Sequence, residues 1–151
     1  MKQNQLVEKL SLQAESFQEG FETLIKCGNF EEITKNFWHI LRGSFLVTNI
    51  ILIHKSSLDS EWKLANSEVE IKKSDLAFLS KKDQLTIKYY EKKKFEVSVV
   101  LPLSDSSYLG ILLGHKLDNS GFSVFDKITL QILLQVFSSA YDSFLNQRKE
   151  K

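Results

Sequence analysis

The chain has 151 residues, of which 42% are hydrophobic and 26% charged, and its formal net charge is +1. This length and composition are typical of one globular domain and exclude an intrinsically disordered chain. The near-neutral charge argues against a nucleic-acid partner. A single cysteine, Cys27, excludes an intrachain disulfide and a cysteine-cluster zinc site, and it fits a reducing compartment.

The apolar runs of the sequence are short. Residues 50–53 and 109–113 are the longest, far below the roughly 20 residues that a membrane-spanning helix needs. Residues 1–5 are polar and lead into a charged segment, which is unlike a secretory signal. We therefore expect a cytoplasmic protein without a membrane partner.

Residues 1–28 predict an amphipathic helix, and residues 29–151 a domain that ends in a long helix. The apolar residues of the first segment recur at heptad spacing, which suits either packing on its own domain or pairing with a second subunit. Amphipathic helices at both termini favour a parallel homodimer. The expected interface residues are Val7, Leu10, Ala14, Phe17, Phe21, Leu24, Leu130, Phe137 and Phe144.

Residues 29–43 are predicted to form a second helix, with a start signal and an end signal. Asn29 is a typical N-cap, and Glu32 stands three residues later in a pattern like a capping box. Gly28 suits the end of the preceding helix, and Gly43 the end of this one. One face of the predicted helix carries Phe30, Ile33, Phe37, Ile40 and Leu41.

Residues 46–54 are β-branched and apolar on both alternating sets, which predicts a central strand covered on both faces. Residues 61–66 alternate and complete a hairpin. A short helix is expected over 74–80 with Ser74 as its cap, and a short strand over 84–90.

The second half predicts a hairpin followed by a long helix. Residues 95–103 alternate as a strand, 105–107 form a turn, and 108–115 return as a second strand in which Gly110 marks a close backbone approach. Ser123, with Asp126 three residues later, caps the last helix. The apolar face expected on one side of the first strand is Phe95, Val97, Val99, Leu101 and Leu103, and that of the helix is Leu130, Leu133, Phe137, Ala140 and Phe144. Hairpins with helices at both ends predict an α+β fold with an antiparallel sheet.

The order of these motifs resembles a GAF domain. The resemblance lies in the run 99–103 (Val-Val-Leu-Pro-Leu), in 109–113 (Leu-Gly-Ile-Leu-Leu), in 122–126 (Phe-Ser-Val-Phe-Asp) and in the leucine-rich helix after them, and it extends over roughly residues 20–147. It implies a GAF/PAS-like sheet of five to six antiparallel strands. It also implies that the N- and C-terminal helices cover one face and a short helix and loops cover the other.

The residues on which the chemistry of several GAF branches depends are incomplete in this chain. Methionine sulfoxide reduction in that family relies on several cysteines, and bilin attachment on a cysteine in the second half, whereas this chain has only Cys27. The cyclic-nucleotide pattern is matched by Phe122 and Asp126, with Lys116 before them, but Lys127 replaces its final glutamate. His39, His54 and His115 lack metal-ligand spacing. We therefore expect no enzyme activity, no metal and no cofactor.

Charge is unevenly distributed. Residues 8–32 hold six glutamates against two lysines, and residues 72–94 hold eight lysines against three acidic residues. The basic stretch is either a solvated face or an anion-attracting rim over a ligand pocket. Polar and aromatic residues in and beside the strands are the candidates for that pocket: Asn49, Trp62, Tyr89, Tyr90, Glu96 and Ser98.

The resemblance implies a sensory or regulatory module of a signalling protein. A small ligand or a partner would change the packing of the terminal helices, and an attached or associated effector would receive that change. The alternative is a dimerisation or scaffold module whose pocket is filled by its own side chains.

Overall fold

The computed structural model describes residues 15, 17–67, 72–79 and 83–149. Its centre is a five-stranded antiparallel sheet in the order β2-β1-β5-β4-β3. The strands are β1 (Ile50–Lys55), β2 (Lys63–Ser67), β3 (Thr86–Tyr89), β4 (Val97–Pro102) and β5 (Tyr108–Leu113). The helices are α2 (Phe30–Phe45), α3 (Lys73–Leu76) and α4 (Val124–Lys149), and residues 17–25 before α2 are also helical.

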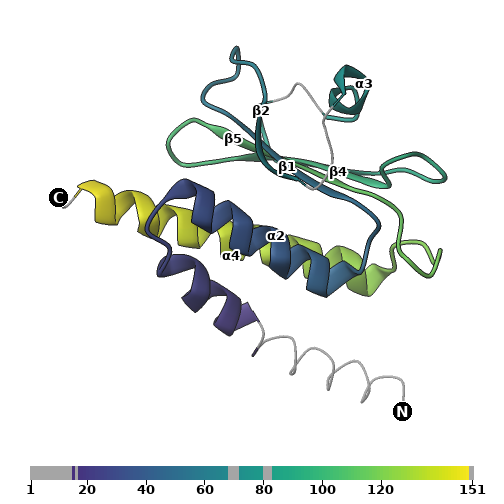
Figure 1. Ribbon diagram of the computed structural model, residues 1–151, viewed down its shortest axis with the longest axis horizontal. Coiled ribbons are helices and arrows are strands. Elements are labelled where there is room, and N and C mark those ends of the chain that lie inside the picture. Colours follow the sequence, from purple (N-terminus) through teal and green to yellow (C-terminus); the bar gives the residue numbers. More distant parts are fainter. Residues whose placement is uncertain (1–14, 16, 68–71, 80–82, 150–151) are drawn as a thin grey trace.

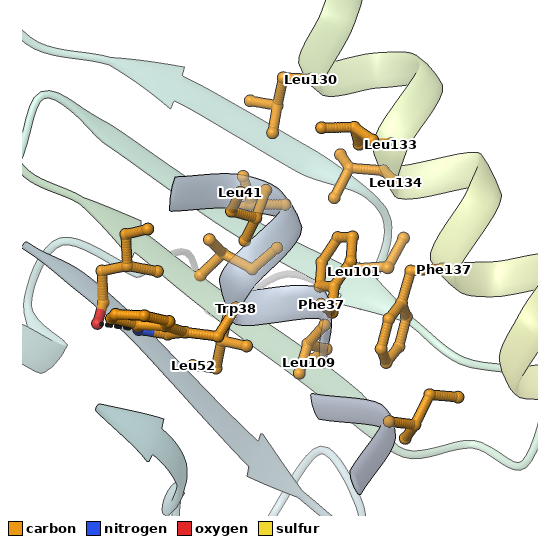
Figure 2. Packing of buried hydrophobic residues seen from close by; sticks show 14 of the residues in the cluster. Phe37, Trp38, Leu41, Leu52, Leu101, Leu109, Leu130, Leu133, Leu134 and Phe137 are labelled. Carbon is orange, nitrogen blue, oxygen red and sulfur yellow. Dashed lines mark hydrogen bonds between the residues drawn. The ribbon is translucent and has the colours of Figure 1, made fainter. Parts of the chain in front are cut away.

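The molecule has three layers. Figure 1 shows α2 and α4 side by side under one face of the sheet and α3 over the other face. The larger core lies between the two long helices and the sheet, where Phe37 and Leu41 of α2 meet Phe137 of α4 and Leu52 and Leu109 of the strands (Figure 2). The predicted α+β class, the antiparallel sheet and the position of the helices are confirmed, with five strands.

The register of β1 against β5 explains why both strands are buried. Ile50 pairs with Leu113 and Lys55 with Tyr108, so the two strands lie side by side over their whole length. Ile50 and Leu52 point to the larger core, and Ile51 and Ile53 to a smaller core under α3. A strand covered on both faces has apolar residues at all positions, as residues 46–54 predicted.

The cap that begins α2 is the predicted one, and the residue that ends α2 is different. Asn29 Oδ1 accepts a hydrogen bond of 2.8 Å from the Glu32 amide, while the Glu32 carboxylate accepts one of 3.0 Å from the Gly28 amide. Gly43 lies inside the helix, which continues to Phe45. Leu46 ends it with a left-handed backbone (φ 51°), and its amide donates to the Arg42 carbonyl.

Three other expected boundaries are corrected. Because Leu46 caps α2, the first strand begins at Ile50 rather than at residue 46. The short helix begins at Lys73, with Lys72 rather than Ser74 at its N-cap position. Phe95 belongs to the smaller core, where its ring lies 5.4 Å from that of Phe78, because the chain bends at residue 96 and interrupts the alternation before β4.

Hydrogen bonds fix α4 at its start and again at Tyr141 and Asp142. At its start, Ser123 and Asp126 form the predicted reciprocal cap, with hydrogen bonds of 2.9 and 3.1 Å. Further along, the Tyr141 hydroxyl donates to Asp105 in the β4–β5 turn over 2.7 Å, and Asp142 accepts from Ser104 in the same turn. Burial acts to raise the pKa of Asp105, but hydrogen bonds from Ser107 and Tyr141 hold that pKa below its usual value.

Four of the residues expected at a dimer interface lie in the core of the chain itself. These side chains are at most 4% exposed, so a second subunit cannot reach them: Leu24, Leu130, Phe137 and Phe144. Phe17 and Phe21 are half-buried and pack against the same core. Val7, Leu10 and Ala14 lie outside the described residues. The amphipathic pattern of α4 therefore reflects packing on its own sheet.

We predict that Gly110→Ala destabilises the fold by about 1–3 kcal/mol, because an added methyl group overpacks the core. A Cβ atom there would lie 2.8 Å from Ile53 Cγ1 and 3.1 Å from Trp62 Cζ3. The matched control is Gly43→Ala, where a Cβ meets nothing within 4 Å and a helix interior gains up to about 1 kcal/mol. Urea denaturation measures both, and an unchanged midpoint for Gly110→Ala contradicts the close approach.

Candidate functional site

A cavity of about 370 Å³ lies where β3 ends and α4 begins. Three segments that are distant in the sequence form it: the connection from β3 to β4, the loop after β5, and the first turn of α4. Its lining residues are Tyr89, Tyr90, Glu91, Lys92, Glu96, Asn119, Gly121, Phe122 and Lys127. This volume is at the lower end of the range for small-molecule sites, which is about 300–1,000 Å³.

The sheet-side wall of the cavity is held by hydrogen bonds that continue the sheet beyond β3. The Tyr90 amide donates to the Glu96 carbonyl over 2.8 Å, and the Glu96 amide donates to the Leu113 carbonyl over 2.9 Å. Between them the chain turns through Lys92, which has a left-handed backbone (φ 54°). The wall is therefore a short, fixed turn that carries Glu91, Lys92 and Glu96.

The opposite wall is the loop that leads into α4. Lys116 Nζ lies 3.0 Å from Asp126 Oδ2, which joins the start of the loop to the first turn of the helix. The Asn119 amide donates to the Lys116 carbonyl, and Asn119 has a left-handed backbone (φ 61°). Lys116 and Asp126, which matched the cyclic-nucleotide pattern, therefore bind each other.

Aromatic rings form the apolar part of the cavity. The Tyr89 and Phe122 ring centroids are 6.4 Å apart, and Phe122 also contacts Phe45 of the larger core. Lys127 Nζ lies 4.7 Å from the centroid of the Tyr89 ring, within reach of a cation–π interaction. Burial, with a smaller contribution from Asp126, raises the pKa of Tyr89, so its hydroxyl is neutral at physiological pH.

Three of the six predicted pocket residues line this cavity together: Tyr89, Tyr90 and Glu96. Ser98 is buried behind them, and its Oγ lies 3.5 Å from the Tyr90 hydroxyl, which donates to the Phe78 carbonyl. The strand alternation over 84–90 gave the correct segment, although β3 contains only Thr86–Tyr89.

Asn49 and Trp62 are not among the lining residues of this cavity. The Asn49 carbonyl accepts from the Gly114 amide at the end of β5. Trp62 packs in the smaller core, and the Lys55 ammonium lies 4.6 Å from its ring. Sequence reasoning missed Asn119, Gly121 and Lys127, because a predicted loop gives no local signal of which strand it will approach.

The basic stretch over 72–94 has two separate roles. Lys92 lines the cavity, as a rim would. Lys94 instead forms an ion pair of 2.7 Å with Asp75, which is only 1% exposed. Burial acts to raise the pKa of Asp75, but the hydrogen bond from Lys94 and others hold it below its usual value. Lys94 therefore stabilises the turn around α3.

A second hollow lies beside β1 and β2, and it contains a histidine with an unusual environment. Phe30, Thr34, His54 and Lys63 are among its lining residues. The His54 ring centroid is 4.6 Å from that of Phe30, and its Nε2 is buried without a hydrogen-bond partner in the described part of the chain. Burial lowers the pKa of His54, and Asp105 opposes this only in part.

In the described ranges, no three His, Cys, Asp or Glu side chains come together in a way that could hold a metal ion. None of the helices in these ranges is both long and apolar enough to span a bilayer.

A solved GAF domain shares the fold of this chain. It belongs to a predicted sensor histidine kinase from Pseudomonas syringae pv. tomato, with a TM-score of 0.64 and 14% sequence identity over 97% of this chain and 95% of that one. No family model and no curated protein matches the sequence. The chain therefore has the GAF fold that its motif order predicted.

We predict that acid destabilises this protein partly through His54. The ordinary histidine pKa is 6.5, so below that pH the unfolded chain takes up a proton that the folded chain resists. The free energy of unfolding should then fall as the pH decreases from about 6.5 through the lower pKa of the folded state. His54→Leu should flatten this slope in denaturant titrations.

The control for this experiment is His39→Leu, because His39 is an exposed side chain of α2. It should keep the wild-type slope. Equal slopes for wild type and His54→Leu between pH 6.5 and 5 would show that the buried imidazole does not resist protonation.

Proposed function

We propose that this chain is a non-catalytic sensory or regulatory module that binds a small ligand in the cavity between β3 and α4. The observation that supports this most directly is the composition of the cavity walls, since one is the edge of the sheet and the other includes Lys127 in the first turn of α4. A ligand there contacts both at once. The GAF fold, shared with a domain of a predicted sensor kinase, is consistent with this role.

We further infer that the domain transmits through α4, and the same geometry supports this. Ligand binding can change the position of a helix only if the ligand binds two arrangements with different affinity. The cavity gives it contacts to the loop after β5 and to the helix, which the Lys116–Asp126 pair joins. We infer that α4 passes this change to an attached or associated effector.

The homodimer remains part of this proposal, with a revised surface. The apolar residues that α4 exposes are Val124 (73%) and Ile128 (41%), not its core-facing ones. The two residues are four positions apart and so lie on the same face of α4, where one partner surface can cover both. A second subunit that packs there would place two copies of α4 together near the two cavities.

The alternative, a scaffold without a ligand, has one specific observation in its favour. The sheet face under α3 is filled by side chains of the chain itself, among them Ile51, Ile53, Phe95 and Trp62. If the cavity at α4 stays empty in the cell, the domain has only its surfaces to act with.

The ligand-binding proposal predicts a thermal shift that depends on the cavity. In a panel of cytoplasmic metabolites and nucleotides, a ligand at 100 times its Kd should stabilise the wild type by about 2.7 kcal/mol. Gly121→Phe should abolish the shift, because a Cβ at this cavity-lining position meets nothing within 4 Å and a larger side chain can occupy the space. Gly43→Phe, equally open but not lining the cavity, is the control. A panel without any shift favours the scaffold.

The dimer prediction is tested by sedimentation. At tens of micromolar we expect a dimer that Ile128→Glu converts to a folded monomer, because a buried charge opposes association. Leu58→Glu, at a residue of similar exposure in the β1–β2 turn (42% against 41%), should leave the dimer intact. A monomeric wild type would refute the dimer and leave the cavity proposal standing.

A further inference from the structure

The charged side chains around the cavity are arranged by sign. The sheet-side turn carries two carboxylates, Glu91 and Glu96, and one ammonium group, Lys92, which leaves that wall with a net charge of −1. The helix-side wall carries the ammonium group of Lys127. The cavity therefore has an acidic side on the sheet and a basic side on α4.

These charges are available to a ligand. Within the described residues, the ion pairs are Lys94–Asp75 and Lys116–Asp126, so none of the four charged lining residues takes part in one. Lys127 lies over the Tyr89 ring, which holds its ammonium group beside the cavity. Lys116, in the loop after β5, is already paired with Asp126, and Lys92 stands on the sheet-side turn between the two glutamates in the sequence.

A ligand with a single charge fits this arrangement poorly. An anion at Lys127 shares this cavity with the carboxylates of Glu91 and Glu96, which Lys92 offsets only in part, and a cation at those carboxylates leaves Lys127 without a partner. Repulsion or an unpaired charge lowers affinity, which is how a site rejects the wrong ligand. A molecule with both charges satisfies both walls.

We propose that the cavity binds a compact zwitterion, an amino-acid-like molecule with an apolar body. This deepens the proposed function and rests on it. The ammonium group of the ligand lies against Glu91 and Glu96, its carboxylate against Lys127, and its apolar part against Tyr89 and Phe122. The volume of about 370 Å³ suits such a molecule better than a much larger ligand.

This ligand class also explains how binding would affect α4. The zwitterion would pair at one end with the glutamates of the sheet-side turn and at the other with Lys127 of α4, so it would draw the two walls together. A ligand that contacted only one wall would lack this difference between open and closed arrangements.

The test uses three matched probes, L-phenylalanine, phenethylamine and 3-phenylpropanoate, measured by calorimetry on the full chain. They share an aromatic body and differ in carrying both charges, only the cation, or only the anion. We expect L-phenylalanine to bind about fivefold more tightly than either analogue, which is the effect of one partly exposed charge pair. Binding should weaken as salt is raised.

Two variants locate the charges. Glu96→Gln and Lys127→Gln should each weaken the binding of L-phenylalanine by about fivefold. Glu96→Gln should leave the affinity for 3-phenylpropanoate no lower than in the wild type. Lys88→Gln, an exposed lysine of β3 that does not line the cavity, is the matched control and should change nothing.

The outcomes separate this inference from the proposed function. If the three probes bind equally, if none binds at millimolar concentration, or if the two charge variants have no effect, the zwitterion is overturned. A metabolite that stabilises the wild type but not Gly121→Phe would then still support a ligand-binding module. If no compound of either set binds, both proposals fail.

Discussion

The carboxylate of Asp126 joins the sheet to the long terminal helix. It accepts a hydrogen bond from the Ser123 amide and forms an ion pair with Lys116. One side chain therefore both caps the start of α4 and holds it to the loop after β5. Because Asp126 is nearly buried, these contacts are little screened by solvent. The position of Phe122 and Lys127, and therefore the shape of the cavity, depends on this junction.

The strands and caps could be read from the sequence because their causes are local. Continuous apolar character marked β1 and β5 as central, and the spacing of Ser123 and Asp126 marked the start of α4. The errors arose where tertiary contacts decide. Gly43 permits a helix end but does not force one, whereas Leu46 adopts the left-handed cap although nothing in its residue type favours it.

Only part of the candidate site could be predicted from the sequence, for the same reason. Tyr89, Tyr90 and Glu96 follow one another around a single turn, so local alternation and polarity were enough to select them. Asn119 reaches the cavity from the loop after β5, and Lys127 reaches it from α4. The whole fold decides how closely these two segments approach β3. The heptad spacing of α4 led to a different error. Packing on a sheet and packing on a second subunit both require one apolar stripe along a helix, so the spacing of Phe137 and Phe144 could not tell the two apart, and both residues are buried in the core.

Tyr141 and Asp105 attach α4 to the β4–β5 turn, which gives the helix a second fixed point besides its first turn. Fifteen residues separate Tyr141 from Asp126, or about 22 Å of helix, and about 12 Å remain beyond it. The helix is therefore held at two separate points, at Asp126 by Lys116 and at Tyr141 by Asp105. In the proposed sensory role, a shift at the first turn of α4 would reach the rest of the helix only by working against this second attachment.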